Sequence, residues 1–331
     1  MPGVKPLWAR SLALGALLSG CNGGIQTDVV ADEEPFKVAL LTPGSISDSG
    51  WNSMAYEGLM AIETALGAKV NNMEATDAQI RDSMRSYAQN GYDLVLGHGY
   101  EYNAPGLEVA EDFPDTVFVS SSGNLFSENS GTFRFHLEQG FYLAGYLAAS
   151  MSQTGKIAAI GLNAIPSIKS TFRGFAHGAR AANPDIVIIE PEMGSTSDIA
   201  AMKQATLAAI NEGADFVIHQ ANEAAQGVFD ACKEKGVYAL GANLDQNDNP
   251  SGVVIASAVI VAKPAYVALA KEVRDGTYEG KVMLMGMSDG AIGFVVNPAL
   301  ADRIPARLLQ TLDDLGQHIA LGNLVIPMDE F

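Results

Sequence analysis

Short apolar runs alternate with longer amphipathic stretches along most of the chain, from residue 36 onward. Runs rich in Val, Ile and Leu predict strands at residues 37–42, 94–97, 116–120, 156–160, 186–189, 216–219 and 238–241. Helical spacing predicts helices at about residues 52–66, 77–90, 103–111, 138–151, 168–182, 199–212 and 223–235. Strands that alternate with helices in this way are typical of βαβ units and parallel sheets.

The length of this alternating region favours two lobes, because about 300 residues exceed what one hydrophobic core usually serves. A second series of units begins near residues 151–161, where Gly155 separates a helix from a new strand. The long apolar run at 252–261 suits a crossing back to the first lobe. A helix at 263–274 and a strand at 281–285 are predicted to follow it.

The predicted fold class is α/β, with two doubly wound parallel-sheet lobes joined by several crossings. The first lobe is expected to comprise residues 36–150 and about 260–285, and the second lobe residues 151–259 and about 286–331. Two such lobes place a cleft at the carboxyl ends of their strands, where ligands bind in open α/β sheets.

The N-terminal stretch is typical of a secretory signal, with an apolar run at residues 12–18 that is too short to span a bilayer. The run ends in Leu18-Ser19-Gly20-Cys21, which resembles the lipobox of bacterial lipoproteins. Residues 1–20 are therefore predicted to be removed, leaving a lipid on Cys21, and an ordinary cleavage site beside a chance cysteine is the alternative. Residues 21–35 are polar and without periodicity, which predicts a flexible tether.

The chain is acidic, which argues against nucleic acid as a partner. Its formal net charge is −18, and loss of the two cations Lys5 and Arg10 with the leader changes this to −20. No disulfide is expected from the two cysteines, because Cys21 would carry lipid. Cys232 lies in a predicted helix and is expected to be a buried thiol.

A series of short motifs extends over almost the whole mature chain. It comprises Asp48-Ser49-Gly50-Trp51-Asn52, Ala55-Tyr56-Glu57-Gly58, Gly91-Tyr92-Asp93-Leu94-Val95, Phe113-Pro114-Asp115 with Phe118, Gly140-Phe141-Tyr142-Leu143-Ala144-Gly145, Phe172-Arg173-Gly174-Phe175, Asn183-Pro184-Asp185, Gly213-Ala214-Asp215, Gly241 and Asp245-Gln246. Each motif alone is weak, but their order is specific. On these residues the chain resembles the basic membrane protein family of bacterial lipoproteins, which are substrate-binding components of ABC transporters. The best-described members of this family are purine nucleoside receptors with a periplasmic-binding-protein type 1 fold. The resemblance therefore implies the same fold for this chain.

The resemblance also implies that the loop after the first strand binds the ligand. In the family an Asp and an Asn of this loop bond a nucleoside, and they match Asp48 and Asn52. An aromatic side chain of the family stacks on the base, and it matches Trp51 or Tyr56. A loop of small residues lets the backbone approach a ligand, and a tryptophan at a helix start offers a flat apolar face. The alternatives are that Asp48 caps the helix and that Trp51 packs in the core.

Further candidates lie where other predicted elements face the cleft. Phe172 or Phe175 offers a second aromatic face, with ordinary helix packing as the alternative. Asn222 and Asp245 follow strands of the second lobe, where a parallel sheet presents groups to ligands. Tyr100 follows a strand of the first lobe in the same way.

Three departures from the family pattern affect the expected ligand. Ser122 stands where the nucleoside receptors carry an Asp, Asn243 replaces another Asp, and Ile260 or a neighbour replaces a Lys that grips ribose. The expected pocket is neutral, aromatic and rich in amides, and suits a nucleoside, a nucleobase or another flat polar heterocycle. An anionic ligand is disfavoured because few basic residues fall at strand ends.

One motif points to an enzyme instead. Gly286-Met287-Ser288-Asp289-Gly290 matches the G-x-S-x-G elbow of serine hydrolases, and His318 follows it. An elbow needs a helix directly after the serine, whereas the next residues are strand-like, so a hairpin turn is the favoured interpretation. His98 and His219 close predicted strands and are weaker ligand candidates. No metal site, cofactor or phosphate loop is expected.

Together these observations predict a lipid-anchored binding protein of the cell envelope rather than an enzyme. It would close as a monomer on a small polar ligand and deliver it to an ABC permease. A sensor that presents its closed form to a signalling partner is the alternative.

Overall fold

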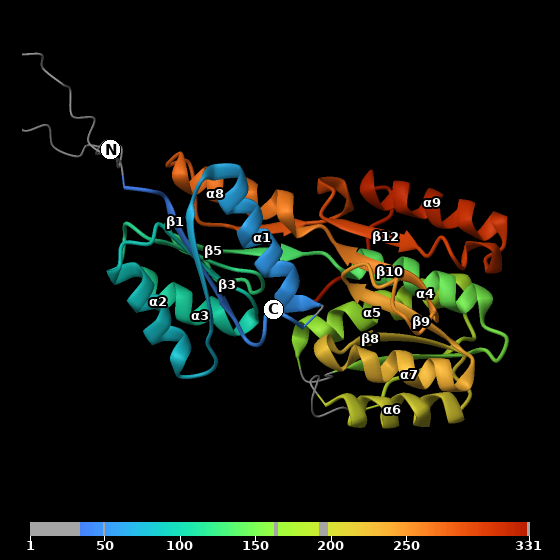
Figure 1. The fold of residues 1–331 in the computed structure, drawn as a ribbon. Helices are drawn as coiled ribbons and strands as arrows, with labels where there is room; N and C mark the ends of the chain where they lie inside the picture. The colour runs from blue at the N-terminus through green and yellow to red at the C-terminus, as the bar shows by residue number, and fades with distance from the viewer. Residues whose placement is uncertain (1–33, 49, 162–164, 192–197, 330–331) are drawn as a thin grey trace, which may run out of the picture.

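The structure, a computed structural model, describes residues 34–48, 50–161, 165–191 and 198–329 and contains two six-stranded sheets (Figure 1). The first sheet has the order β11-β5-β4-β3-β1-β2. Its strands are β1 (Lys37–Thr42), β2 (Lys69–Glu74), β3 (Leu94–Gly97), β4 (Val117–Ser120), β5 (Ser130–Phe135) and β11 (Val282–Met285). Every neighbouring pair in it is parallel.

The second sheet has the order β12-β10-β9-β8-β6-β7 and is parallel except for its β10–β12 pair. Its strands are β6 (Lys156–Gly161), β7 (Val187–Ile189), β8 (Phe216–Gln220), β9 (Tyr238–Asn243), β10 (Val254–Ile260) and β12 (Ile292–Val296). The prediction of an α/β fold with two parallel-dominated sheets is therefore confirmed.

Helices cover both faces of each sheet, as buried parallel strands require. In the first lobe, α1 (Trp51–Leu66) packs with α8 (Ala262–Arg274), and α2 (Gln79–Gln89) packs with α3 (Asn103–Ala110). Alternate residues of β1 serve the two faces: Val38 belongs to the cluster that includes α1, and Ala39 to the cluster that includes α2.

In the second lobe, α4 (Glu138–Met151) packs with α5 (Pro166–Ala182), and α6 (Ile199–Asn211) packs with α7 (Ala225–Lys235). The last helix, α9 (Ala306–Ala320), lies against α4. Residues 138–150 were predicted to belong to the first lobe. The structure differs, because α4 packs on α5, β10 and β12 of the second lobe. No helix in the described part of the chain has the length and apolar run that a bilayer crossing needs.

Two strands and one connection differ from the expectations. The strands β2 and β5 were not predicted, because KVNNME and SGTFRF contain no long apolar run. The expected hairpin around Ser288 is wrong: β11 pairs with β5 in the first sheet, and β12 pairs with β10 in the second. The segment between them therefore crosses from one lobe to the other.

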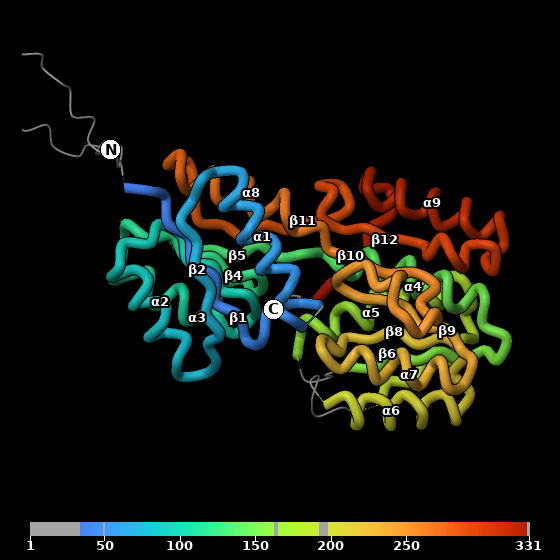
Figure 2. The backbone as a smooth tube through the Cα atoms, in the orientation of Figure 1, coloured from blue at the N-terminus to red at the C-terminus, as the bar shows by residue number. Residues whose placement is uncertain are grey.

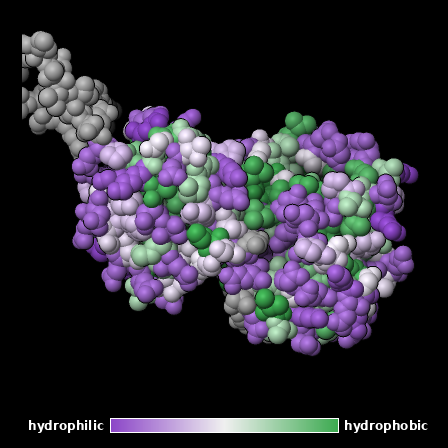
Figure 3. Space-filling model, in the orientation of Figure 1, coloured by the Kyte–Doolittle hydropathy of each residue, from purple (hydrophilic) through white to green (hydrophobic). Residues whose placement is uncertain are grey.

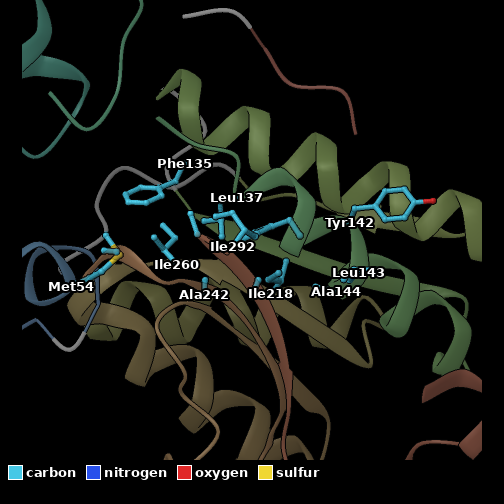
Figure 4. Packing of buried hydrophobic residues seen from close by; sticks show 14 of the residues in the cluster. Met54, Phe135, Leu137, Tyr142, Leu143, Ala144, Ile218, Ala242, Ile260 and Ile292 are labelled. Atoms are coloured by element: carbon cyan, nitrogen blue, oxygen red, sulfur yellow. The ribbon is translucent and has the colours of Figure 1, made fainter. Parts of the chain in front are cut away.

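The lobes are joined by short crossings that share one hydrophobic cluster. In the described residues the chain crosses after β5, after β10 and between β11 and β12. Figure 4 shows Phe135, Leu137, Ile260 and Ile292 of these segments gathered close together, with Met54 of α1 beside them. In the tube view the chain after α9 returns to the region between the lobes, where the C-terminus is marked (Figure 2).

Glycines allow α4 and α5 to approach closely. A Cβ on Gly178 would lie 1.8 Å from the carbonyl oxygen of Tyr142, and a Cβ on Gly145 would lie 2.0 Å from that of Phe175. Real side chains never come so close, so the helix pair depends on the absence of these two Cβ atoms.

We expect Gly178→Ala to lower the free energy of unfolding by about 3 kcal/mol, because the added methyl overpacks the helix pair. Gly106→Ala is the matched control, since a Cβ there would meet its nearest atom at 3.6 Å inside α3. It should raise stability by about 1 kcal/mol through helix propensity. Urea unfolding measures both, and equal effects of the two variants would contradict the close-packing argument.

Candidate functional site

A cavity of about 370 Å³ lies between the two sheets at the carboxyl ends of their strands. Its first-lobe wall is made by residues that follow β1, β3 and β4 and by the end of β5. Its second-lobe wall is made by the start of α5 and by residues at the ends of β8, β9 and β10. The space-filling view shows the indentation between the two lobes (Figure 3).

Asp48 fixes the start of α1 and also lines the cavity. Its Oδ1 accepts hydrogen bonds from the backbone N–H of Gly50 at 3.0 Å and of Ser53 at 2.9 Å, and its Oδ2 accepts from that of Asn52 at 2.9 Å. This is the helix-capping alternative that the sequence left open, and it places a negative charge at the positive end of the helix. The cap also positions the Asn52 side chain on the cavity wall.

Trp51 lines the cavity and is stacked on His98, with ring centroids 4.0 Å apart and an interplanar angle of 26°. The Nε2 of His98 lies 2.8 Å from the carbonyl oxygen of Trp51, which can only accept, so Nε2 carries the hydrogen. The Nδ1 therefore accepts, from Ser121 Oγ at 2.9 Å and from the Tyr266 hydroxyl at 3.2 Å. Burial lowers the pKa of His98 to about 3, so the imidazole is neutral.

Amide side chains line the second-lobe wall. The Nδ2 of Asn243 donates to Gln220 Oε1 at 3.4 Å, and the Nε2 of Gln220 donates to Thr171 Oγ1 at 3.4 Å. Asn243 and Asn222 both have left-handed backbone angles, with φ of 70° and 37°. Non-glycine residues in this region concentrate at functional sites, and asparagine tolerates the conformation best.

The remaining predicted residues divide into two groups. Tyr100 and Ser122 line the first-lobe wall, Tyr100 being 46% exposed and Ser122 buried. The other group lies away from the cavity wall and comprises Tyr56, Phe172, Phe175 and Asp245.

The two phenylalanines are buried because the face of α5 that carries them packs on α4. The ring centroids of Phe172 and of Phe141 in α4 lie 6.3 Å apart. Asp245 is exposed and accepts a hydrogen bond from the backbone N–H of Asn247 at 3.0 Å, which closes a turn. His219 is also buried, and it lies 3.0 Å from Gln246 Oε1 rather than on the wall.

An ion pair that the sequence did not single out lies at the floor of the cavity. Arg134 is the penultimate residue of β5 and Glu138 is the first residue of α4, and their side chains are 6% and 2% exposed. The Nη2 of Arg134 donates to Glu138 Oε1 at 3.0 Å. The spacing of four residues is a helical signal, but the pair spans a strand end and a helix start, so only the tertiary structure reveals it.

The described cavity lining is acidic. Asp48, Glu101, Glu138 and Glu223 contribute carboxylates, and Arg134 contributes a cation that Glu138 already pairs. Burial, with a smaller contribution from Asp77, raises the pKa of Glu101. The arrangement disfavours phosphates and carboxylates and admits neutral or cationic ligands.

The segment around Ser288 lacks the geometry of a hydrolase elbow. Residues 287–289 form a single 3-10 turn, and β12 rather than a helix follows. The hydroxyl of Ser288 is exposed and donates to Asp289 Oδ2 at 3.0 Å. Within the described residues, no group of three or more His, Cys, Asp or Glu is placed to hold a metal ion.

Residues 36–330 match the family described as "ABC transporter substrate-binding protein PnrA-like". The chain belongs to this family. The resemblance carried by the sequence motifs is thus confirmed. Because the PnrA-like family is one of substrate-binding proteins, the cavity is compared with a substrate-binding site rather than with the active site of an enzyme.

Known proteins similar to this PnrA-like chain align over most of their length. The transcriptional activator protein Med of Bacillus subtilis (strain 168) is 30% identical over 308 residues, covering 91% of this chain and 94% of Med. A purine-binding protein of Brucella abortus (strain 2308) is 27% identical over 266 residues, covering 78% and 75%. A solved ABC transporter solute-binding protein from Conexibacter woesei DSM 14684 shares 26% identity at a TM-score of 0.73, covering 88% and 99%. The chain has their periplasmic-binding-protein type 1 fold.

We expect the buried histidines to make the protein acid-sensitive. The folded pKa of His98 is about 3 and that of His219 about 4, both lowered by burial below the ordinary 6.5. Because the unfolded state takes up these protons first, stability is complete above about pH 6.5 and falls as the pH drops toward 4, by about 1.4 kcal/mol per pH unit for each histidine.

Urea unfolding followed by Trp51 fluorescence measures this slope. His98→Gln should reduce this slope by about 1.4 kcal/mol per pH unit, the contribution of one histidine. The contributions of carboxylates cancel in the comparison of variant and wild type. An unchanged slope in the variant would mean that His98 is not the neutral buried group described.

Proposed function

We propose that the chain captures a nucleoside, nucleobase or related flat heterocycle between its lobes and delivers it to an ABC permease. The observation that carries the proposal is the cavity wall at Trp51, an indole that is supported on one face by His98 and lines the cavity. A flat aromatic surface favours stacking of a flat ligand. Asn52, Gln220 and Asn243 supply amide donors and acceptors at the same cavity.

Two further observations support this ligand class. The acidic lining argues against anionic and phosphorylated ligands. The relative from Brucella abortus is named for purine binding. Three lining residues differ from the nucleoside receptors: Ser122 and Asn243 each replace an Asp, and Ile260 replaces a Lys. The contacts of this chain to base and ribose are therefore expected to differ from those of the receptors.

Transport by such a protein requires an open and a closed arrangement of the lobes. A ligand held by Asp48 and Asn52 from one lobe and by Asn222 and Asn243 from the other gains its full contacts only when both lobes meet it. The differential affinity shifts the equilibrium to the closed form, which the permease recognises.

Trp51 provides a direct assay, because it is the only tryptophan of a chain that begins at residue 22. Purines, pyrimidines and their nucleosides should change its fluorescence in a saturable way. Asn243→Ala should weaken binding about tenfold through loss of a buried amide contact, and Asn211→Ala, an exposed position on α6, should have no effect. Saturation by sugars or amino acids alone would contradict the proposed ligand class.

We also propose that Cys21 carries the lipid that anchors the protein to the membrane, facing the periplasm or exterior. Cys21→Ser should abolish incorporation of labelled fatty acid and release the protein from the membrane fraction. Cys232→Ala is the matched control, because this thiol is buried in the second lobe and should leave the label unchanged. Label retained by Cys21→Ser would contradict the anchor.

The similarity to Med supports a second candidate, a sensor whose closed form is read by a regulatory partner. Both roles use the same cavity and the same closure, and they differ in the protein that binds the closed form. Cross-linking of the ligand-saturated protein in membranes distinguishes them by capturing either a permease or a regulator.

A further inference from the structure

Two buried oxygen atoms at the cavity have no hydrogen-bond partner among the described residues. They are Oδ1 of Asn52, on the first-lobe wall, and Oε2 of Glu138, at the cavity floor. The two side chains are 4% and 2% exposed. Buried polar groups are almost always paired, so two unpaired acceptors at one cavity require an explanation.

The carboxylate of Glu138 is held in one orientation by its other oxygen. Oε1 accepts from Arg134 Nη2 at 3.0 Å and from the hydroxyl of Ser170. Ser170 Oγ in turn accepts from the backbone N–H of Asp329 at 2.9 Å, and Arg134 Nη1 donates to the Asp329 carbonyl at 2.7 Å. These four bonds form a closed ring that fixes Glu138 and leaves Oε2 unused, which is the pre-organisation that a recognition group needs.

Asn52 is held in a comparable way by the helix start. Its backbone N–H donates to Asp48 Oδ2 at 2.9 Å, which fixes the first turn of α1 and with it the base of the side chain. Asp48 itself already accepts three backbone hydrogens. Among the described side chains that line the cavity, Asn52 and Glu138 are the ones with a buried oxygen that accepts no hydrogen bond.

We propose that Asn52 and Glu138 select a ligand that presents hydrogen-bond donors to both of them, so that the ligand class is a neutral or cationic heterocycle with free N–H groups. This rests on the proposed function, which it refines from flat heterocycles to donor-bearing ones. A negatively charged Oε2 at a buried site accepts a strong, charge-assisted hydrogen bond from such a group. A ligand that lacks the donor leaves the carboxylate oxygen unpaired, and a site with unpaired buried groups rejects it.

Xanthine and caffeine form a matched pair of probes, because caffeine is xanthine with a methyl group on every N–H. Fluorescence titration of Trp51 at slightly acidic pH, where xanthine is neutral, compares their affinities. Xanthine should bind at least about tenfold more tightly, the equivalent of one buried charge-assisted hydrogen bond. Adenosine and its dimethylamino counterpart repeat the comparison with a nucleoside.

Glu138→Gln tests the acceptor directly. Arg134 Nη2 and Ser170 Oγ both donate to one atom, so the oxygen of the new amide must take the place of Oε1 and its NH2 group the place of Oε2. The variant therefore presents a donor where the wild type presents an acceptor. Xanthine should bind at least about tenfold less tightly to it, and the preference for xanthine over caffeine should collapse.

Two controls keep the result interpretable. Glu63→Gln makes the same chemical change at an exposed position of α1 and should leave both affinities unchanged. If Glu138→Gln proves unfolded in ligand-free thermal denaturation, Asn52→Leu removes the other acceptor and should reduce the same preference.

The outcomes separate the two proposals. A collapsed preference in Glu138→Gln or Asn52→Leu, with Glu63→Gln unaffected, supports the inference. Equal binding of methylated and unmethylated probes, or an unchanged preference in the variants, overturns the inference alone. Absence of binding by every heterocycle overturns both the inference and the proposed function.

Discussion

The fold depends on the short crossings between its two sheets. The chain passes from one sheet to the other after β5, after β10 and between β11 and β12, and the first two crossings span only a few residues. Phe135, Leu137 and Ile260 lie at these crossings, belong to the shared hydrophobic cluster and also form part of the cavity lining. The floor of the cavity is consequently a packed core, whereas its walls belong to separate lobes, and this combination suits closure about a fixed base.

The same arrangement explains how a charged pair is tolerated beside that core. Burying a carboxylate and a guanidinium is costly unless both are paired and hydrogen-bonded. Arg134 and Glu138 meet this condition through each other, Ser170 and the main chain of Asp329. The segment after α9 therefore contributes to the site although it is distant in sequence, because its return to the crossing completes the ring of hydrogen bonds.

Much of the fold was predictable, and the failures have physical causes. LVLG of β3 and the apolar helix α4 were predicted with their observed bounds because each buries nearly all of its residues. β2 is an edge strand with mostly exposed side chains, so it lacks an apolar run. β5 carries a buried arginine, a residue type that sequence patterns assign to the surface. Its burial depends on the ion pair with Glu138, four residues later, which only the tertiary structure shows.

The predicted site residues at strand ends lie where the rule for parallel sheets places them, whereas the two residues predicted on α5 do not lie at the cavity. Asp48, Trp51, Tyr100, Ser122, Asn222 and Asn243 lie at the cavity because they follow strands or begin a helix there. The positions of Phe172 and Phe175 depend on how α5 is rotated, which is set by Gly145 and Gly178 at the contact with α4.

Sequence motifs identified the loop of Asp48, but the hydrogen bonds show that its carboxylate is largely occupied by the helix it caps. The proposed recognition of donors therefore adds neighbours whose oxygens remain unpaired, a distinction that depends on counting lone pairs in three dimensions.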